Sequence, residues 1–322
     1  MGTLDAYEQE IHYQVHDLPM VMEGMDGAWL SSDEQSRALI TGSGDSFAAA
    51  MIAERLSGFR IQCIDPLELA SIMGSLAGRR MMLYIVSISG STKAALDAME
   101  IARRHGMKVV AITANAESRL ARGADSSMLL RFRRSGMLTA GSIGFTASLL
   151  ASASLAIRMG RVSVDIDGIF SQAKSDSRDM VLDGHIYIVG DVLTYPLAVY
   201  GAAKVYEVLG ARASYCRLEQ FCHMEVFSLA DGDRVLVLSS EAKARRLVDG
   251  LMGSGIDAKL IEYAGREGVS SSSDGSAETL GRLLYYTFLL QFATLNSARR
   301  LGLKECAFIG HRLLGLSSAL IY

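Results

Sequence analysis

The feature that most constrains the fold is an alternation of short apolar runs with helical stretches. In the first half, runs rich in β-branched and apolar residues end at glycine or serine, and helical periodicity follows. The expected strands are 38–42, 61–64, 82–86, 108–112 and 127–130, and the expected helices are 46–56, 92–105 and 141–159. Such alternation is typical of parallel strands joined by right-handed helical crossovers, so we expect an α/β fold.

The second half repeats the same pattern. Its expected strands are 185–190, 213–216, 234–240 and 258–261, and its expected helices are 195–209, 242–252 and 280–301. Gly42 precedes Ser87 by about the same length of chain as Gly190 precedes Ser239. The polar stretch 161–168 and a helix at 169–180 separate the halves. We therefore expect a tandem duplication, with domains at residues 1–160 and 161–322.

Composition excludes several classes of protein. The 322 residues are 50% hydrophobic with a net charge of −3, so nothing favours nucleic acid or an anionic membrane as a partner. The apolar stretch 147–157 is shorter than the ~20 residues of a membrane span. The N-terminus lacks the basic region of a signal peptide. We expect a cytoplasmic protein.

The cysteines are scattered and form no CxxC pair: Cys63, Cys216, Cys222 and Cys306. This spacing argues against a zinc knuckle or a disulfide framework and favours free thiols, mostly buried. A metal site of Cys222, His223 and Glu225 is disfavoured, because neighbours along a strand or tight turn point apart. We expect no metal and no cofactor.

The clearest candidate binding element follows the expected strand 82–86. The strand leads into Ser87-Ile-Ser-Gly-Ser-Thr92 and then into a helix. The first N–H groups of a helix lack intrahelical partners, so together with hydroxyl groups they can hold a phosphate. The alternative is an ordinary serine or threonine helix cap. The corresponding stretch of the second half, Ser239-Ser240-Glu241, has lost the glycine and gained a carboxylate, so only the first half should bind phosphate.

These motifs together resemble the double-domain form of the sugar isomerase (SIS) domain family. The resemblance rests on Thr41-Gly-Ser-Gly-Asp-Ser46, the loop 87–92 and their repetition. It extends to Tyr7–Ile11, to Leu138–Thr146 and to the segment from Tyr195 to Glu207. It is similar in particular to the isomerase half of glucosamine 6-phosphate synthase, to glucosamine 6-phosphate deaminases and to archaeal-type phosphoglucose/phosphomannose isomerases. The resemblance implies two tandem three-layer αβα domains of flavodoxin-like type.

The resemblance also implies a site. A hexose 6-phosphate would be held by the hydroxyl loop, with further contacts from the first helix and from the turn before the helix that closes the first domain. The implied binding residues are Ser46, Ser87, Ser89, Ser91, Thr92, Ala140 and Ser142. Glu207 would move the proton between C1 and C2, and His223, sixteen residues later, would help to open the ring. Family members often take this histidine from a second subunit, which implies a homodimer, and the apolar C-terminal tail suits such a contact.

Several positions depart from the family. The chain begins at the isomerase half, so we expect no transfer of ammonia from glutamine. The tail 308–322 lacks the lysine that forms a Schiff base in the synthase, and Lys304 is the nearest substitute. Glu219 stands one position away from its family counterpart, so no role is carried over to it. The serine-rich stretch 265–276, in particular 270–276, is expected to be a surface loop, with phosphorylation as an alternative role.

Two classes of function remain open. The first is an enzyme on a hexose or amino-hexose 6-phosphate, as an aldose–ketose isomerase or as a deaminase. The Tyr195-Pro-Leu-Ala helix favours the amino-sugar branch, and Phe221-Cys-His-Met-Glu225 favours the phosphoglucose/phosphomannose branch. The second is a non-catalytic sugar-phosphate sensor. No basic DNA-recognition helix precedes residue 38, which favours the enzyme.

Overall fold

The computed structural model describes residues 2–76, 80–265, 270–271 and 275–322. Most of the expected serine-rich loop, residues 266–269 and 272–274, lies outside the described residues. The chain forms two compact units, each assembled from three segments. The first-sheet unit comprises residues 13–133, 143–161 and 312–322, and the second-sheet unit comprises residues 1–12, 134–142 and 162–311. The long helix α1 (Thr3–Gly24) contributes residues to both units.

The first sheet consists of five parallel strands in the order β2-β1-β3-β4-β5. The strands are β1 (Ala38–Gly42), β2 (Gln62–Cys63), β3 (Met82–Val86), β4 (Lys108–Thr113) and β5 (Ser126–Leu129). All five residues of β1 are buried, as expected for a strand covered on both faces. The order 2-1-3-4-5 is that of the flavodoxin-like fold and agrees with the sequence expectation.

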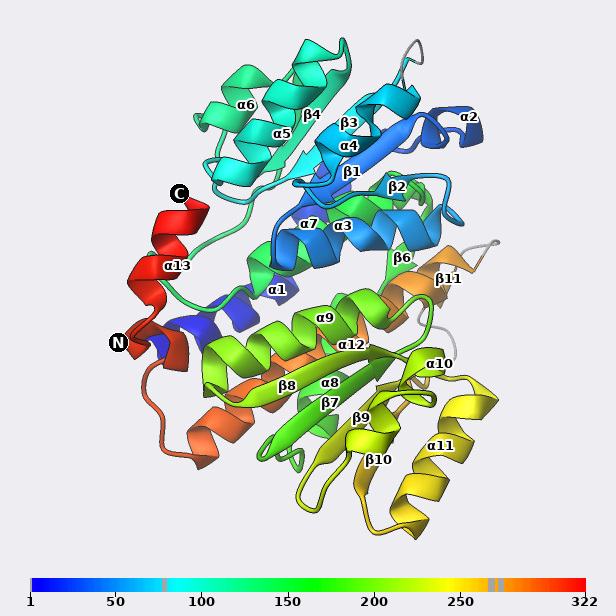
Figure 1. The fold of residues 1–322 in the computed structure, drawn as a ribbon, viewed down its shortest axis with the longest axis vertical. Helices are drawn as coiled ribbons and strands as arrows, with labels where there is room; N and C mark the ends of the chain where they lie inside the picture. The colour runs from blue at the N-terminus through cyan, green and yellow to red at the C-terminus, as the bar shows by residue number, and fades with distance from the viewer. Residues whose placement is uncertain (1, 77–79, 266–269, 272–274) are drawn as a thin grey trace. The chain divides into compact units, whose positions relative to one another are not determined.

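Helices cover both faces of this sheet (Figure 1). One face packs on α4, α5 and α6 through a cluster that includes Leu39, Leu83, Leu96 and Leu120. The other face packs on α3 and α7. The helices of this unit are α2 (Ser32–Gln35), α3 (Asp45–Leu56), α4 (Leu69–Ile72), α5 (Lys93–Arg104), α6 (Arg119–Gly123), α7 (Ile143–Ser154) and α13 (Leu314–Ile321). The expected helix 141–159 is thus shorter than predicted and is followed by a 3₁₀ turn at Met159–Arg161.

The second sheet repeats the arrangement with four parallel strands, in the order β10-β9-β7-β8. These are β7 (His185–Gly190), β8 (Arg212–Arg217), β9 (Arg234–Leu238) and β10 (Asp257–Ile261). If β7, β8, β9 and β10 are numbered 1 to 4 along the chain, the strand order read from the β8 edge is 2-1-3-4, as in the first sheet. The duplication predicted from the sequence therefore holds at the level of strand order.

Helices α10 and α11 pack on one face of the second sheet, while α9 lies on β7 and β8 and contacts α12, which in turn packs on α8. The bounds are α8 (Ile166–Asp176), α9 (Tyr195–Lys204), α10 (Leu218–Phe221), α11 (Ala242–Gly253) and α12 (Ser276–Arg300). Two short strands, β6 (Ser163–Val164) and β11 (Ser270–Ser271), pair in antiparallel orientation. No helix among the described residues is long and apolar enough to cross a membrane.

Candidate active site

The hydroxyl loop, residues 87–92, joins the carboxyl end of β3 to the start of α5. Its hydroxyl groups are linked to one another. Ser87 Oγ lies 3.2 Å from Thr92 Oγ1, and Ser91 donates from its hydroxyl to Ser89 Oγ at 3.0 Å. Thr92 is the N-cap residue of α5, but its side chain makes no capping hydrogen bond, which leaves the first-turn N–H groups of α5 without a side-chain cap. This geometry suits an anion better than an ordinary cap does.

Gly90 gives the loop its shape. Its φ is +62°, and a Cβ atom there would lie 2.1 Å from Ser118 Oγ. Its N–H donates to Ser87 Oγ at 3.2 Å. Both the left-handed backbone and the contact with Ser118 require a residue without a side chain.

Ser46 lies in the first turn of α3, directly after β1. The register pairs Gly42 at the end of β1 with Val86 at the end of β3, so the two following loops leave the same edge of the sheet side by side. A Cβ on Gly42 would come within 2.7 Å of the Ser46 backbone, which shows how closely α3 starts on the strand end. In a 2-1-3-4-5 sheet the crevice between strands 1 and 3 is the topological switch point, where ligands of such folds bind. The sequence-predicted Ser46, Ser87, Ser89, Ser91 and Thr92 all follow these two strands.

Ala140 and Ser142 belong to the second-sheet unit and lie on a turn anchored by α1. Both are buried. Glu10 accepts hydrogen bonds from the Ser135 N–H at 3.0 Å and the Ser135 hydroxyl at 2.7 Å, and lies 3.5 Å from Ser142 Oγ. The Tyr200 hydroxyl donates to the Gly141 carbonyl at 2.8 Å. Glu10, which the sequence did not single out, is thus the anchor of this turn.

Glu207 lies on a π-helical turn, Val205–Leu209, that continues α9 and ends at Gly210. Its carboxylate forms an ion pair with Lys204, whose side chain is fully buried, while 35% of the Glu207 side chain is exposed. The Lys204 ammonium also lies 5.0 Å from the centre of the Tyr200 ring. A buried ammonium needs a partner, because an unpaired charge in the interior is very costly. The ion pair therefore fixes the position of the Glu207 carboxylate, while part of the Glu207 side chain stays accessible to solvent.

Two tyrosines surround this ion pair. The Tyr200 hydroxyl accepts a hydrogen bond from Gln291 at 3.0 Å. Tyr7 of α1 is fully buried, and burial raises its pKa, while the charges of Lys204 and Glu207 act on it in opposite directions. From the sequence, the alternative interpretation of Glu207 is a solvated helix residue paired with Lys204 or Arg212; the structure shows the pair with Lys204, but Lys204 is fully buried. The available signal was that Lys204 is the only charged residue of α9 and stands three residues before Glu207.

His223 follows α10 at the other end of β8. Its Nε2 lies 3.0 Å from Glu219 Oε1, and the side chain is 67% exposed. Glu219 also pairs with Lys243, and the pKa of Glu219 is lowered first by Lys243 and then by His223. Glu207 precedes β8 and His223 follows it, and six strand residues span roughly 20 Å at ~3.3 Å each. Within one chain, the structure does not bring Glu207 and His223 together.

The remaining candidates are the cysteines and Lys304. All four cysteines are free, and Cys216 and Cys306 are buried. Burial, with a further contribution from Glu225, raises the pKa of Cys216 to about 12. In the part of the chain that the structure describes, no group of three metal-ligating side chains is placed to hold an ion. Lys304 is exposed, in the segment that follows α12.

Comparison with known proteins agrees with this architecture. Residues 33–158 match the sequence model of the SIS domain. No curated protein matches the chain by sequence. The fold is similar to the C-terminal domain of glucosamine-fructose-6-phosphate aminotransferase from Francisella tularensis, with a TM-score of 0.68 at 15% identity, over 92% of this chain and 96% of that one.

Two further solved structures share the fold. Glucosamine-6-phosphate deaminase from Thermotoga maritima aligns with a TM-score of 0.66 at 20% identity, over 93% of this chain and 96% of the other. Tagatose-6-phosphate ketose/aldose isomerase from Escherichia coli aligns with a TM-score of 0.60 at 17% identity, over 94% and 91%. At these identities the likeness concerns the fold.

Proposed function

We propose that this chain is a phosphosugar isomerase acting on a hexose or amino-hexose 6-phosphate, because residues 33–158 match the SIS domain and the fold is similar to that of solved proteins that act on such sugars. The observation that carries the proposal is the hydroxyl loop at the β1–β3 switch point, with its hydroxyls linked and the first turn of α5 uncapped. The amino-sugar substrate is favoured, as a glucosamine 6-phosphate/fructose 6-phosphate isomerase or deaminase. The alternatives are a phosphoglucose/phosphomannose isomerase and a sugar-phosphate sensor.

In the proposed reaction, Ser87, Ser89, Ser91 and Thr92 hold the phosphate and Ser46 lines the sugar. Glu207 removes the proton from one of C1 and C2 and returns it to the other. Lys204 holds the Glu207 carboxylate in one position through their ion pair, and a proton-accepting group must be positioned against the proton that it removes. Proton transfer by a positioned base typically contributes ~10²- to 10⁴-fold to a rate.

His223 would contribute to the active site of a second copy of the chain. The separation of Glu207 and His223 by the length of β8 supports this reading, since one chain cannot apply both side chains to one sugar. A homodimer follows, in which each site takes Glu207 from one chain and His223 from the other. We retain residues 1–160 and 161–322 as the proposed repeats, and a cytoplasmic location as part of the proposal.

Proton NMR in D₂O tests the reaction directly. Glucosamine 6-phosphate and fructose 6-phosphate are incubated separately with the protein, and ammonia is assayed in the same samples. Ammonia release from the amino sugar establishes the deaminase. Deuterium at C2, or formation of glucose or mannose 6-phosphate without ammonia, establishes the plain isomerase. Saturable binding without any exchange leaves the sensor and contradicts the catalytic role of Glu207.

The shared site has its own test. Glu207→Gln and His223→Ala are each inactive in the proposed mechanism, but mixed dimers contain one site with both wild-type residues. Random re-association of equal amounts should restore about a quarter of the wild-type activity. If the mixture stays inactive while each variant remains dimeric, the sharing of sites is wrong. A monomeric wild-type protein would also contradict it.

A further inference from the structure

A second candidate binding site lies on the outer face of the first-sheet unit, between α5 and α6. A cavity of about 360 Å³ opens there. We call it the arginine cavity; its lining residues are Leu96, Asp97, Met99, Glu100, Arg103, Arg104 and Arg119. Cavities that hold small molecules begin at about this size. None of these residues belongs to the hydroxyl loop or to its neighbours on β1.

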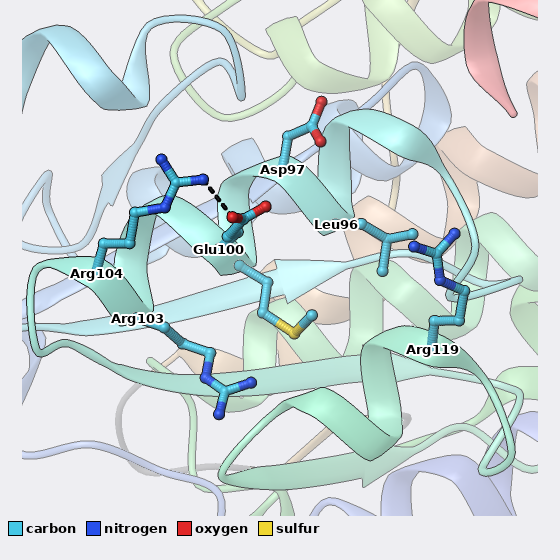
Figure 2. A pocket seen from close by; sticks show the side chains of 7 residues that line it. Leu96, Asp97, Glu100, Arg103, Arg104 and Arg119 are labelled. Carbon is cyan, nitrogen blue, oxygen red and sulfur yellow. Dashed lines mark hydrogen bonds and ion pairs between the residues drawn. The ribbon is translucent and has the colours of Figure 1, made fainter.

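The charges of the arginine cavity do not cancel. Arg104 pairs with Glu100, and Asp97 pairs with Lys93, which lies outside the lining set. Figure 2 shows the Arg104–Glu100 pair, with Arg103 and Arg119 extending separately from α5 and α6. Both acidic groups of the lining are thereby neutralised. Among the described residues, no carboxylate pairs with Arg103 or Arg119.

Helical spacing explains why both arginines lack partners. Residues three and four positions apart lie next to each other on a helix. Arg103 has Met99 four positions before it, and the Glu100 three positions before it is taken by Arg104. Arg119 has Arg122 and Gly123 at these positions on α6. Both guanidinium groups are exposed to solvent, so an anion in the cavity can approach either of them without displacing an existing ion pair.

The rest of the lining is apolar. Leu96 is 9% exposed, and Met99 packs over Gly123, where an added Cβ would lie 2.7 Å from the Met99 sulfur. Leucine and the polarisable methionine sulfur suit the flat or apolar part of a ligand. Guanidinium groups recognise phosphate through paired hydrogen bonds.

We propose that the arginine cavity binds a small phosphomonoester with an apolar or aromatic body, at a site separate from the hydroxyl loop. Arg103 and Arg119 hold the phosphate, and Leu96 and Met99 contact the body. Such a site would let a second phosphorylated metabolite bind the protein without competing for the sugar-phosphate site.

Calorimetric titration with adenosine 5′-monophosphate, inorganic phosphate and adenosine tests this proposal on the full-length protein. We expect saturable binding of the monophosphate, weaker binding of inorganic phosphate and none of adenosine. Arg103→Gln with Arg119→Gln should weaken binding of the monophosphate by about tenfold or more, since each charged hydrogen bond is worth at least that factor. Arg122→Gln is the matched control, because Arg122 lies on α6, pairs with Glu117 and does not line the cavity.

A second pair of variants separates this site from the hydroxyl loop. Ser89→Ala with Thr92→Ala should leave binding of the monophosphate unchanged. If that variant abolishes it, the ligand occupies the hydroxyl loop and the arginine cavity is not a site. Equal affinities for the wild type and the Arg103/Arg119 variant would overturn the proposal as well. Neither result depends on whether the protein is an isomerase.

Discussion

The two sheets share one strand order but differ at the corresponding switch point. In the first sheet, the loops after β1 and β3 carry hydroxyl groups and two glycines, Gly44 and Gly90, and Asp45 is the first residue of α3. In the second sheet, Gly190 at the end of β7 is in register with Leu238 at the end of β9. There the Arg282 guanidinium lies 3.6 Å from the Asp191 carboxylate and 3.3 Å from Ser240 Oγ.

The second switch point is therefore filled by the protein's own charges. Asp191 also accepts hydrogen bonds from the backbone N–H groups of Leu193 and Thr194, at 2.9 and 3.0 Å. Glu241 is the N-cap residue of α11, the position that Thr92 has before α5. A carboxylate in each place provides the negative charge that a phosphate would supply. Under the proposed function, the duplicated fold keeps a binding edge in the first sheet and fills the corresponding edge of the second sheet with charged side chains, while Glu207, on the turn that continues α9, supplies the proposed base.

The largest expected effect separates the roles of the two halves. Glu207→Gln should lower turnover by ~10²- to 10⁴-fold while leaving sugar-phosphate affinity nearly unchanged, because the proposed base is lost and the hydroxyl loop is intact. Steady-state kinetics and calorimetry on the same preparation measure both. Glu241→Gln, an exposed carboxylate of the same unit, is the control and should retain full turnover. An active Glu207→Gln protein would remove the proposed base from the second half.

The next effect concerns the two loops themselves. Ser89→Ala with Thr92→Ala should weaken sugar-phosphate binding by about ten- to a hundredfold, because hydrogen bonds to a charged phosphate are lost. Ser239→Ala with Ser240→Ala makes the same change at the second switch point and should leave the affinity unchanged. Calorimetric titration compares the two. Similar losses in both variants would mean that the second switch point also binds the ligand.

Gly90 tests the backbone difference between the loops. Gly90→Ala forces an L-residue to φ +62° and presses its Cβ on Ser118, whose Oγ caps α6. We expect the free energy of unfolding to fall by about 3 kcal/mol, combining the cost of the left-handed conformation and of the clash. Gly106→Ala isolates the first cost, because Gly106 has φ +70° and open space around its Cβ position.

Denaturant unfolding should show that Gly106→Ala lowers the free energy of unfolding by about 1 kcal/mol. If the two glycine variants lower the free energy of unfolding equally, the contact of the added Cβ with Ser118 does not contribute to the loss. The described residues between Leu238 and Ala242 have no positive φ, so the second loop has no glycine with this role.

The smallest expected effect lies in the second sheet. Arg282→Met should lower the free energy of unfolding by about 1 kcal/mol, since Asp191 loses a partner in a setting where its side chain is only 11% exposed. Sugar-phosphate affinity should not change. Arg245→Met removes an exposed ion pair with Glu262 and should change stability by less than about 0.5 kcal/mol. A gain in phosphate affinity in Arg282→Met would show that the ion pair masks a working second site.

The sequence predicted the parts of the fold that depend on local pattern. Strands such as Met82–Val86 and His185–Gly190 were predicted at their observed bounds, because buried parallel strands are nearly continuous apolar runs. The position of the hydroxyl loop between β3 and α5 was also predicted, since its residues are contiguous, and its binding role stays a prediction. Arg282 was missed, because it stands 91 residues after Asp191 and no local period links them.

The relation between Glu207 and His223 shows the same limit. Their spacing in sequence predicted one site, with the histidine expected from a second subunit on the family resemblance, and only the folded chain shows that Glu207 and His223 of one chain lie at opposite ends of β8. The burial of Lys204 was missed for a different reason. A lysine at the end of a helix ordinarily reads as a favourable charge next to the helix carboxyl end, and only packing reveals that it is fully buried.

The composition of each unit from three separate segments has a consequence for biosynthesis. The first-sheet unit includes residues 312–322, and the second-sheet unit includes residues 1–12. A ribosome that has translated the first sheet has therefore also produced an N-terminal segment whose partners are still unmade, and the first-sheet unit itself lacks α13 until residues 312–322 have been made. Domains often fold one after another as they emerge. Here the first-sheet unit is completed only by residues 312–322, after the whole second-sheet unit has been made, so the two units cannot be completed in the order in which their strands emerge.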